Sequence, residues 1–124
     1  MTIQSENNKT VEVLSLIDSG AGGEFVDQNY ARNMGFNVQK LSKPLIARNV
    51  DGTRNKQGTI TSFVDLNLKI NNRTMNTRLL VTGLGKQKVI LGFPWLNEQN
   101  PNIDWTTGML TWRTNTPRRF IKIK

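Results

Sequence analysis

The triplet Asp18-Ser19-Gly20 contains the residue types in this sequence that are best suited to chemistry. The chain has no histidine and no cysteine, so imidazole bases and thiolate nucleophiles are absent. An aspartate can act as a general acid or base. The Ser19 hydroxyl can donate a hydrogen bond, and Gly20 permits close approach of a substrate to the backbone. Because Asp-Ser-Gly is also a common turn tripeptide, catalysis needs support from the rest of the chain.

The residues before Asp18 predict a strand that delivers the carboxylate to a water-poor place. Residues 11–17 begin in apolar–polar alternation and end apolar, as a strand does where it enters a core. We therefore expect Leu14, Leu16 and Ile17 to be buried. Burial of the strand end would make ionisation of Asp18 costly.

The remainder of the chain predicts an all-β or mainly β domain with one or two short helices, closed like a barrel. Alternation and turn residues indicate strands or hairpins over residues 45–60, 59–70, 77–81, 89–91 and 103–112. A helix is expected over residues 27–35, with Asp27 as its N-cap and Gly35 beyond its end. A second is expected over residues 94–100, since Pro94 suits the first helical position.

Composition indicates one globular domain over residues 1–124, with a core over about residues 10–112 and a basic tail over 113–124. The chain is 36% hydrophobic and 21% charged, which is typical of globular rather than disordered proteins. No apolar run approaches the ~20 residues of a membrane span, and the polar opening is unlike a signal peptide. The absence of cysteine suits a reducing compartment. We therefore expect a cytoplasmic protein, free or associated with a particle, that makes no contact with membranes.

A second motif, Ile90-Leu91-Gly92, places a glycine between an apolar strand and a short helix. Such a strand can pass close behind the Asp18 turn, because glycine makes room. Together, the two motifs and the glycine-containing hairpin between them resemble a retropepsin. Residues 90–96, 100–105 and 108–112 are similar to the protease domain of gypsy-type LTR retrotransposon polyproteins and their domesticated relatives. The resemblance covers about residues 10–112.

The resemblance implies an aspartic endopeptidase that is a homodimer of barrel-like subunits, with one active site on the twofold axis. The sequence has a single Asp-Ser-Gly triplet, whereas a bilobal pepsin-like chain has two. The two Asp18 side chains would hold a water and share a proton, because like charges so close cannot both ionise. One would act as base on the water while the other polarises the scissile carbonyl. The implied substrate is a polypeptide, its own polyprotein, and no cofactor or metal is required.

The same resemblance assigns the remaining site residues. Ser19 would hydrogen-bond around the dyad, and Gly20 would present its carbonyl to the substrate. A hairpin would form a flap over an extended peptide, with its tip near Asp51-Gly52, which favour tight turns, or near Gly58. The residues expected to bind the peptide are Gly20, Ala21, Gly22, Asn49, Val50, Asp51 and Gly52.

Two other functions stay open at this point. The fold could serve without activity as a domesticated dimerisation or peptide-binding module, although a scaffold gains nothing from carboxylates that face each other. The net charge of +8 could also support weak contact with nucleic acid through the basic surface. However, the charge is dispersed, and its dense stretch is confined to the tail.

Several further polar and aromatic residues have simpler interpretations than catalysis. Glu24 departs from the family pattern and adds a carboxylate near the site. Three other carboxylates are expected to be a helix cap, a surface strand residue and a turn residue, namely Asp27, Asp65 and Asp104. The tryptophans are expected to fill the core and interfaces, namely Trp95, Trp105 and Trp112.

Overall fold

The computed structural model describes residues 1–4, 10–48 and 54–113, which form ten strands and two short helices. The strands are β1 (Thr2–Gln4), β2 (Thr10–Glu12), β3 (Ser15–Ile17), β4 (Phe25–Asp27), β5 (Gln39–Arg48), β6 (Arg54–Ile70), β7 (Arg73–Thr82), β8 (Val89–Leu91), β9 (Asn102–Asp104) and β10 (Met109–Thr111). The helices are α1 (Gln28–Met34) and α2 (Phe93–Gln99). The domain is therefore mainly β, as expected.

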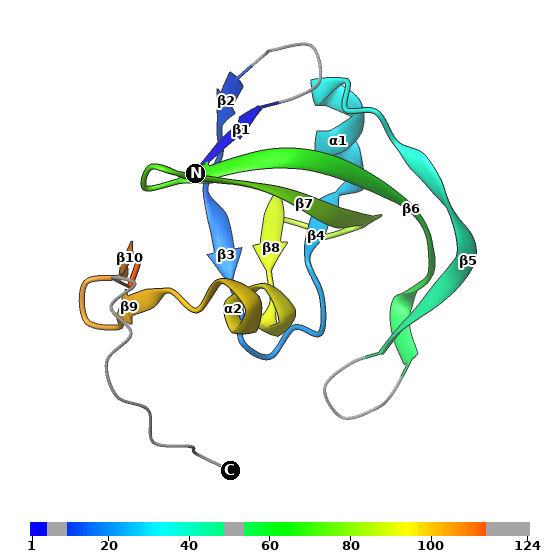
Figure 1. The fold of residues 1–124 in the computed structure, drawn as a ribbon. Helices are drawn as coiled ribbons and strands as arrows, with labels where there is room; N and C mark the ends of the chain where they lie inside the picture. Colours follow the sequence, from blue (N-terminus) through cyan, green and yellow to red (C-terminus); the bar gives the residue numbers. More distant parts are fainter. Residues whose placement is uncertain (5–9, 49–53, 114–124) are drawn as a thin grey trace.

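One sheet contains eight of the strands and curls into half a barrel. Its order is β2-β1-β6-β7-β4-β8-β3, with β5 paired to β6 outside this path. Figure 1 shows β6 and β7 as a long curved pair with β5 alongside, and β3, β8 and β4 through the middle of the molecule. β9 and β10 form a separate hairpin beyond α2.

The central arrangement for function is the position of β8 between β3 and β4. β8 runs parallel to β3, with Ile17 opposite Leu91, and antiparallel to β4, with Phe25 opposite Ile90. Residues 18–24, the Asp18 loop, connect β3 to β4. The loop therefore spans the end of β8, and Val89 and Leu91 are fully buried beneath it in the sheet.

The N-terminal part of the chain differs from the single strand expected over residues 11–17. The chain forms two strands there, β2 and β3, separated at Val13, whose N–H donates to the Met1 carbonyl at 2.9 Å. β2 pairs with β1, while β3 leaves for β8. β1 itself places Ile3, fully buried, opposite Leu68 of β6. One apolar residue in a polar segment has no periodicity, so the sequence pattern could not indicate this strand.

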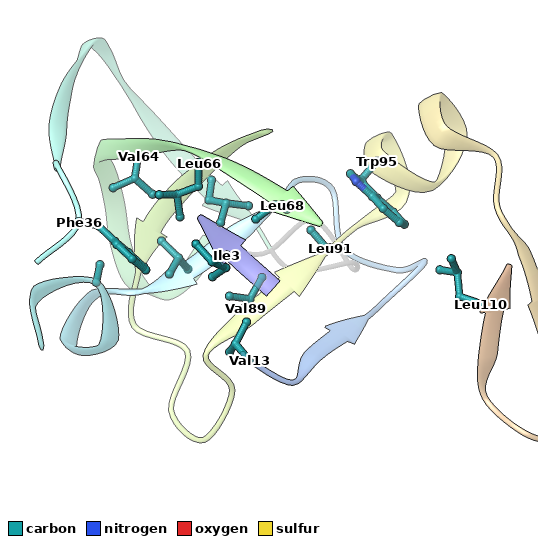
Figure 2. Close-up of a cluster of buried hydrophobic side chains, with 13 residues drawn as sticks. Ile3, Val13, Phe36, Val64, Leu66, Leu68, Val89, Leu91, Trp95 and Leu110 are labelled. Atoms are coloured by element: carbon teal, nitrogen blue, oxygen red, sulfur yellow. The ribbon is translucent and has the colours of Figure 1, made fainter. Parts of the chain in front are cut away.

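The core extends from the sheet to the C-terminal hairpin. Figure 2 shows Trp95 of α2 and Leu110 of β10 at one end of the buried cluster. Trp112 packs edge-on against Trp95, with ring centroids 6.2 Å apart. Trp105, in contrast, is 77% exposed at the start of the β9–β10 turn. The expectation of a core role is wrong for Trp105, because it lies in the turn beyond the Ile103–Leu110 pair that packs against the cluster; a role in an interface stays a prediction.

The local structural roles expected for three carboxylates are confirmed. Asp27 caps α1 by accepting from the Tyr30 N–H at 3.1 Å, and the helix ends at Gly35 with φ 72°. Asp65 pairs with Arg78 on the exposed side of the β6–β7 hairpin at 3.0 Å. Asp104 accepts from the Thr106 N–H at 2.9 Å in the β9–β10 turn.

Candidate active site

Backbone hydrogen bonds hold Asp18 at the start of its loop. The Asp18 N–H donates to the Leu91 carbonyl at 2.9 Å, which extends the β3–β8 pairing by one residue. The Asp18 carbonyl accepts from the Ala21 N–H at 3.0 Å and closes a turn. Within this turn the Gly20 N–H donates to Asp18 Oδ1 at 2.9 Å. One carboxylate oxygen is therefore oriented by the loop, while Oδ2 accepts no hydrogen bond from the described residues.

Gly92 allows α2 and the Asp18 loop to touch. A Cβ at this position would lie 2.2 Å from the Gly23 carbonyl oxygen and 2.6 Å from the Ala21 carbonyl oxygen. The next residue, Phe93, donates its N–H to the same Ala21 oxygen at 2.9 Å. The expectation that glycine makes room behind the Asp18 turn is confirmed, and the contact is between backbone atoms.

The expected burial around Asp18 is wrong. Leu14 is 90% exposed and Leu16 is 40% exposed, and only Ile17 is partly buried. Leu14 lies between β2 and β3 and belongs to neither strand, and Leu16 lies on β3, an edge strand with a neighbouring strand on one side alone. Asp18 itself is exposed in the single chain.

The other predicted loop residues lie beside Asp18 in different states. Ser19 and Gly22 are exposed, and the Ser19 hydroxyl makes no hydrogen bond within the described residues. Ala21 is partly buried, and its carbonyl is already engaged by Phe93. Gly20 uses its N–H on Asp18 and is itself exposed. The roles of these residues toward a dyad and a peptide stay predictions.

The predicted flap residues Asn49, Val50, Asp51 and Gly52 lie outside the described residues, as do tail residues 114–124. The strands on either side of these residues are described: β5 and β6 pair antiparallel as far as Arg48 opposite Arg54. Gly58, the alternative turn point, is inside β6 with φ 82°, beside a shift in register. It is not the end of the hairpin.

Glu24 has a role at the site that sequence reasoning missed. It is the last residue of the Asp18 loop, and its Oε2 accepts from the Trp95 N–H of α2 at 3.3 Å. Its own carbonyl accepts from the Leu80 N–H at 2.9 Å. The Glu24–Trp95 contact spans 71 positions of sequence, so no local spacing indicates it. The one available signal was that Gly92, the N-cap of α2, has no side chain to cap the helix, so an acceptor has to come from another segment.

The partly buried position of Glu24 predicts a specific pH dependence of stability. Burial raises the pKa of Glu24 above its ordinary value of 4.5, the N–H groups of Trp95 and Gly92 act in the opposite direction, and the charge of Glu98 adds to the rise. The folded chain therefore keeps this proton to higher pH than the unfolded chain does. Stability must then fall as the pH rises through the interval from 4.5 up to the raised folded pKa.

We expect Glu24→Gln to remove the pH dependence of stability that Glu24 causes, because an amide does not ionise. The measurement is the free energy of unfolding by urea for both proteins from acid to neutral pH. Relative to the variant, the wild type should lose stability as the pH rises. A wild type that gains stability relative to Glu24→Gln over this interval would contradict the prediction.

Two properties of the described residues bear on cofactors and membranes. No group of three acidic, histidine or cysteine side chains comes together there as a metal site requires. Neither of the helices in this part of the chain has the length and apolar character needed to cross a membrane.

The sequence that builds this site matches a known protein family. Residues 14–119 match the sequence profile of the PEG10/RTL1 protease domain. The chain belongs to this family. The resemblance to retropepsin-like domains of gypsy-type elements and their domesticated relatives is thereby confirmed.

A solved structure supports the fold of this PEG10/RTL1-type domain. The crystal structure of the retroviral protease-like domain of Ddi1 from Leishmania major is similar to it, with a TM-score of 0.52. The sequences are 16% identical, and the match covers 90% of this chain and 84% of that one. At this identity the likeness concerns the fold, and it confirms the expected retropepsin-like architecture.

Proposed function

We propose that this chain is an aspartic endopeptidase that is active as a homodimer and uses one Asp18 from each copy. The observation that carries the proposal is the presentation of Asp18. Its backbone is bonded to β8, one carboxylate oxygen is oriented by Gly20, and the side chain is exposed. An aspartate held in this way can face solvent, a peptide or the same residue of a second copy.

The chemistry follows from two such carboxyls with one proton between them. The ionised Asp18 takes a proton from water as the oxygen adds to the scissile carbonyl carbon. The protonated Asp18 gives its proton to the carbonyl oxygen, which yields a tetrahedral diol. When the C–N bond breaks, the proton held by the first carboxyl passes to the amine, and a diol hydroxyl returns its proton to the other. No histidine exists in the chain to share these transfers.

Exposed apolar side chains near Asp18 also support a site that a peptide and a second copy cover. Leu16 precedes Asp18 by two residues on the edge strand, and Phe93, which is 56% exposed, adjoins the Gly92 contact. Leu16 leads into the Asp18 loop and the Phe93 N–H is bonded to it, and exposed apolar residues beside a candidate site favour interaction with another molecule. A peptide in the site, together with a second copy, would remove these side chains from water.

The substrate class that fits is an extended polypeptide, in keeping with the polyprotein processing that the family resemblance implies. The direct test is cleavage of a peptide library by the purified protein, with and without a transition-state mimic such as pepstatin. Cleavage that the mimic inhibits supports the proposal. Dimerisation or peptide binding without any cleavage would favour the inactive module instead.

A single Asp18 per chain predicts that activity depends on protein concentration. Below the dissociation constant of the dimer, specific activity should fall about 10-fold for each 10-fold dilution, because the dimer fraction falls in proportion to concentration. The measurement pairs kinetics with sedimentation over the same range. Two copies joined by a flexible linker should lose this dependence, and a fully active monomer would contradict the twofold site.

A further inference from the structure

Helix α2 begins without a capping side chain of its own. Its N-cap is Gly92, and its first turn contains no acidic residue. Pro94 in this turn has no N–H to satisfy. The first bond within the helix runs from the Leu96 N–H to the Gly92 carbonyl at 3.1 Å. The remaining free N–H groups of the first turn therefore need acceptors from elsewhere.

Both of those acceptors come from the Asp18 loop. The Phe93 N–H donates to the Ala21 carbonyl at 2.9 Å, and the Trp95 N–H donates to Glu24 Oε2 at 3.3 Å. Burial raises the pKa of the Glu24 carboxyl, and the Gly92 N–H acts against that rise. The start of α2 and the loop that presents Asp18 thus satisfy each other's polar groups, and neither is complete without the other.

The Asp18 loop contacts its neighbours through several backbone hydrogen bonds and through the side chain of Glu24. The loop is bonded to β8 at its start, through Asp18 and Leu91, and to α2 in its middle, through Ala21 and Phe93. At its end it is bonded to β7 through the Glu24 carbonyl and the Leu80 N–H, and to α2 through the Glu24 carboxylate. Trp95, whose N–H donates to this carboxylate, is 3% exposed and belongs to the core cluster. Glu24 therefore fastens the loop to a rigid part of the molecule.

We propose that Glu24 is a positioning residue for Asp18: its carboxylate, as an acceptor for the start of α2, holds the end of the Asp18 loop in the conformation that aims the aspartate. The inference rests on the proposed function for its effect on catalysis. It makes a separate statement about the loop, which can be tested whether or not the protein cleaves peptides.

The expected effect on catalysis follows from the length of the loop. Seven residues separate β3 from β4, and their alignment depends on contacts at both ends. A misplacement of about 1 Å at a catalytic group can lower the rate about 10²-fold. Loss of the Glu24 side-chain contact would leave the backbone bonds of Asp18 to Leu91 and of the Glu24 carbonyl to the Leu80 N–H in place, and would loosen the loop where it meets α2.

The experiment compares three variants of the whole chain. Glu24→Ala removes the acceptor, and Glu24→Gln keeps an acceptor oxygen in the same place without the charge. Glu98→Gln is the matched control, since it changes an exposed carboxylate on α2 that accepts no bond from the described part of the loop. If Glu24→Ala does not fold, Glu24→Asp, which withdraws the carboxylate by one methylene, takes its place.

The first measurement is amide hydrogen exchange at Ala21 and Phe93, which needs no catalysis. We expect exchange at both to be about 10-fold faster or more in Glu24→Ala, while Glu24→Gln and Glu98→Gln stay near the wild type. Unchanged exchange at these two amides in Glu24→Ala would overturn the inference. If the wild type cleaves no peptide, the proposed function fails and this measurement alone decides the inference.

The second measurement is kcat per active site, with sites counted by titration with a tight-binding inhibitor. Glu24→Ala should lower kcat per site about 10- to 100-fold with little change in KM. Glu24→Gln should restore it to within about 3-fold of the wild type, because a neutral acceptor keeps most of the bond. A Glu24→Ala protein that has fewer sites but normal kcat per site would show a merely structural role. Equal losses in both variants would also overturn the inference, because it rests on acceptor geometry rather than on charge.

Discussion

Asp18→Asn is expected to abolish peptide cleavage and to leave the fold and the dimer intact. Asparagine is nearly isosteric with aspartate, and its carbonyl oxygen can still accept from the Gly20 N–H that holds Asp18 Oδ1 at 2.9 Å. The proposed reaction needs one ionised and one protonated carboxyl, and two amides supply neither. Since acid–base catalysis contributes about 10²- to 10⁴-fold and the dyad provides both partners, the rate should fall by about 10⁴-fold or more.

The measurement is peptide cleavage by the wild type and the variant from about pH 4 to 8. The wild type should show a bell-shaped profile on the acid side of neutral, because activity requires a dyad with a single proton. Its two limbs belong to the pair as a unit. No histidine is present to produce the acid limb.

Two comparisons make the Asp18 prediction specific. Asp65→Asn carries the same chemical change on the exposed strand β6, where the pair with Arg78 contributes little to stability, and it should keep full activity. In two copies joined by a linker, Asp18→Asn in one half alone should already remove activity. Residual cleavage by pure Asp18→Asn protein would mean that another residue does the chemistry.

Gly92→Ala is expected to disrupt the site by forcing α2 away from the Asp18 loop. The added methyl carbon would lie 2.2 Å from the Gly23 oxygen and 2.6 Å from the Ala21 oxygen. Both are backbone atoms, so no side chain can rotate away to relieve the clash. Overpacking of a core costs about 1–3 kcal/mol where side chains can adjust, and this case should reach about 3 kcal/mol or more. That loss corresponds to a fall in Tm on the order of 10 °C.

Activity should fall with stability in Gly92→Ala, by about 10²-fold per folded dimer, because the loop that carries Asp18 must shift. The measurements are urea unfolding and kcat. Gly22→Ala is the matched control for stability: the same methyl group is added in the same loop, where it would meet nothing within 4 Å. If Gly92→Ala were as stable as Gly22→Ala and as active as the wild type, the contact behind the Asp18 turn would not constrain the site.

Local patterns in the sequence were sufficient for the two helices, the final hairpin and the two motifs of the site. Alternation predicted the final hairpin, and the residue types at Asp27 and Gly35 predicted both ends of α1. Asp-Ser-Gly and Ile-Leu-Gly indicated the family, which residues 14–119 confirm. These features depend on neighbours in the chain, whose spacing determines which groups can bond or share a face.

The surroundings of the site depended on the tertiary structure. Apolar residues before Asp18 indicate burial in general, but Leu14 lies outside the strands and Leu16 lies on the edge strand β3, and both are exposed. Ile3 is buried only because β1 pairs with β6, a strand far along the chain. Position in a sheet is set by the whole set of pairings, and no periodicity within one strand reports it.

The role of Glu24 shows the same limit at the level of one side chain. Its residue type predicts an acceptor, and Gly92 predicts a helix start that lacks one. That the two meet across 71 positions of sequence is decided by β8, which lies between β3 and β4 and brings α2 against the Asp18 loop. The sequence by itself thus determined which residue could do the chemistry and which strands lead to it. Only the packing of distant segments decided what holds that residue in place, because hydrogen bonds between loops are formed by proximity in space and not by spacing along the chain.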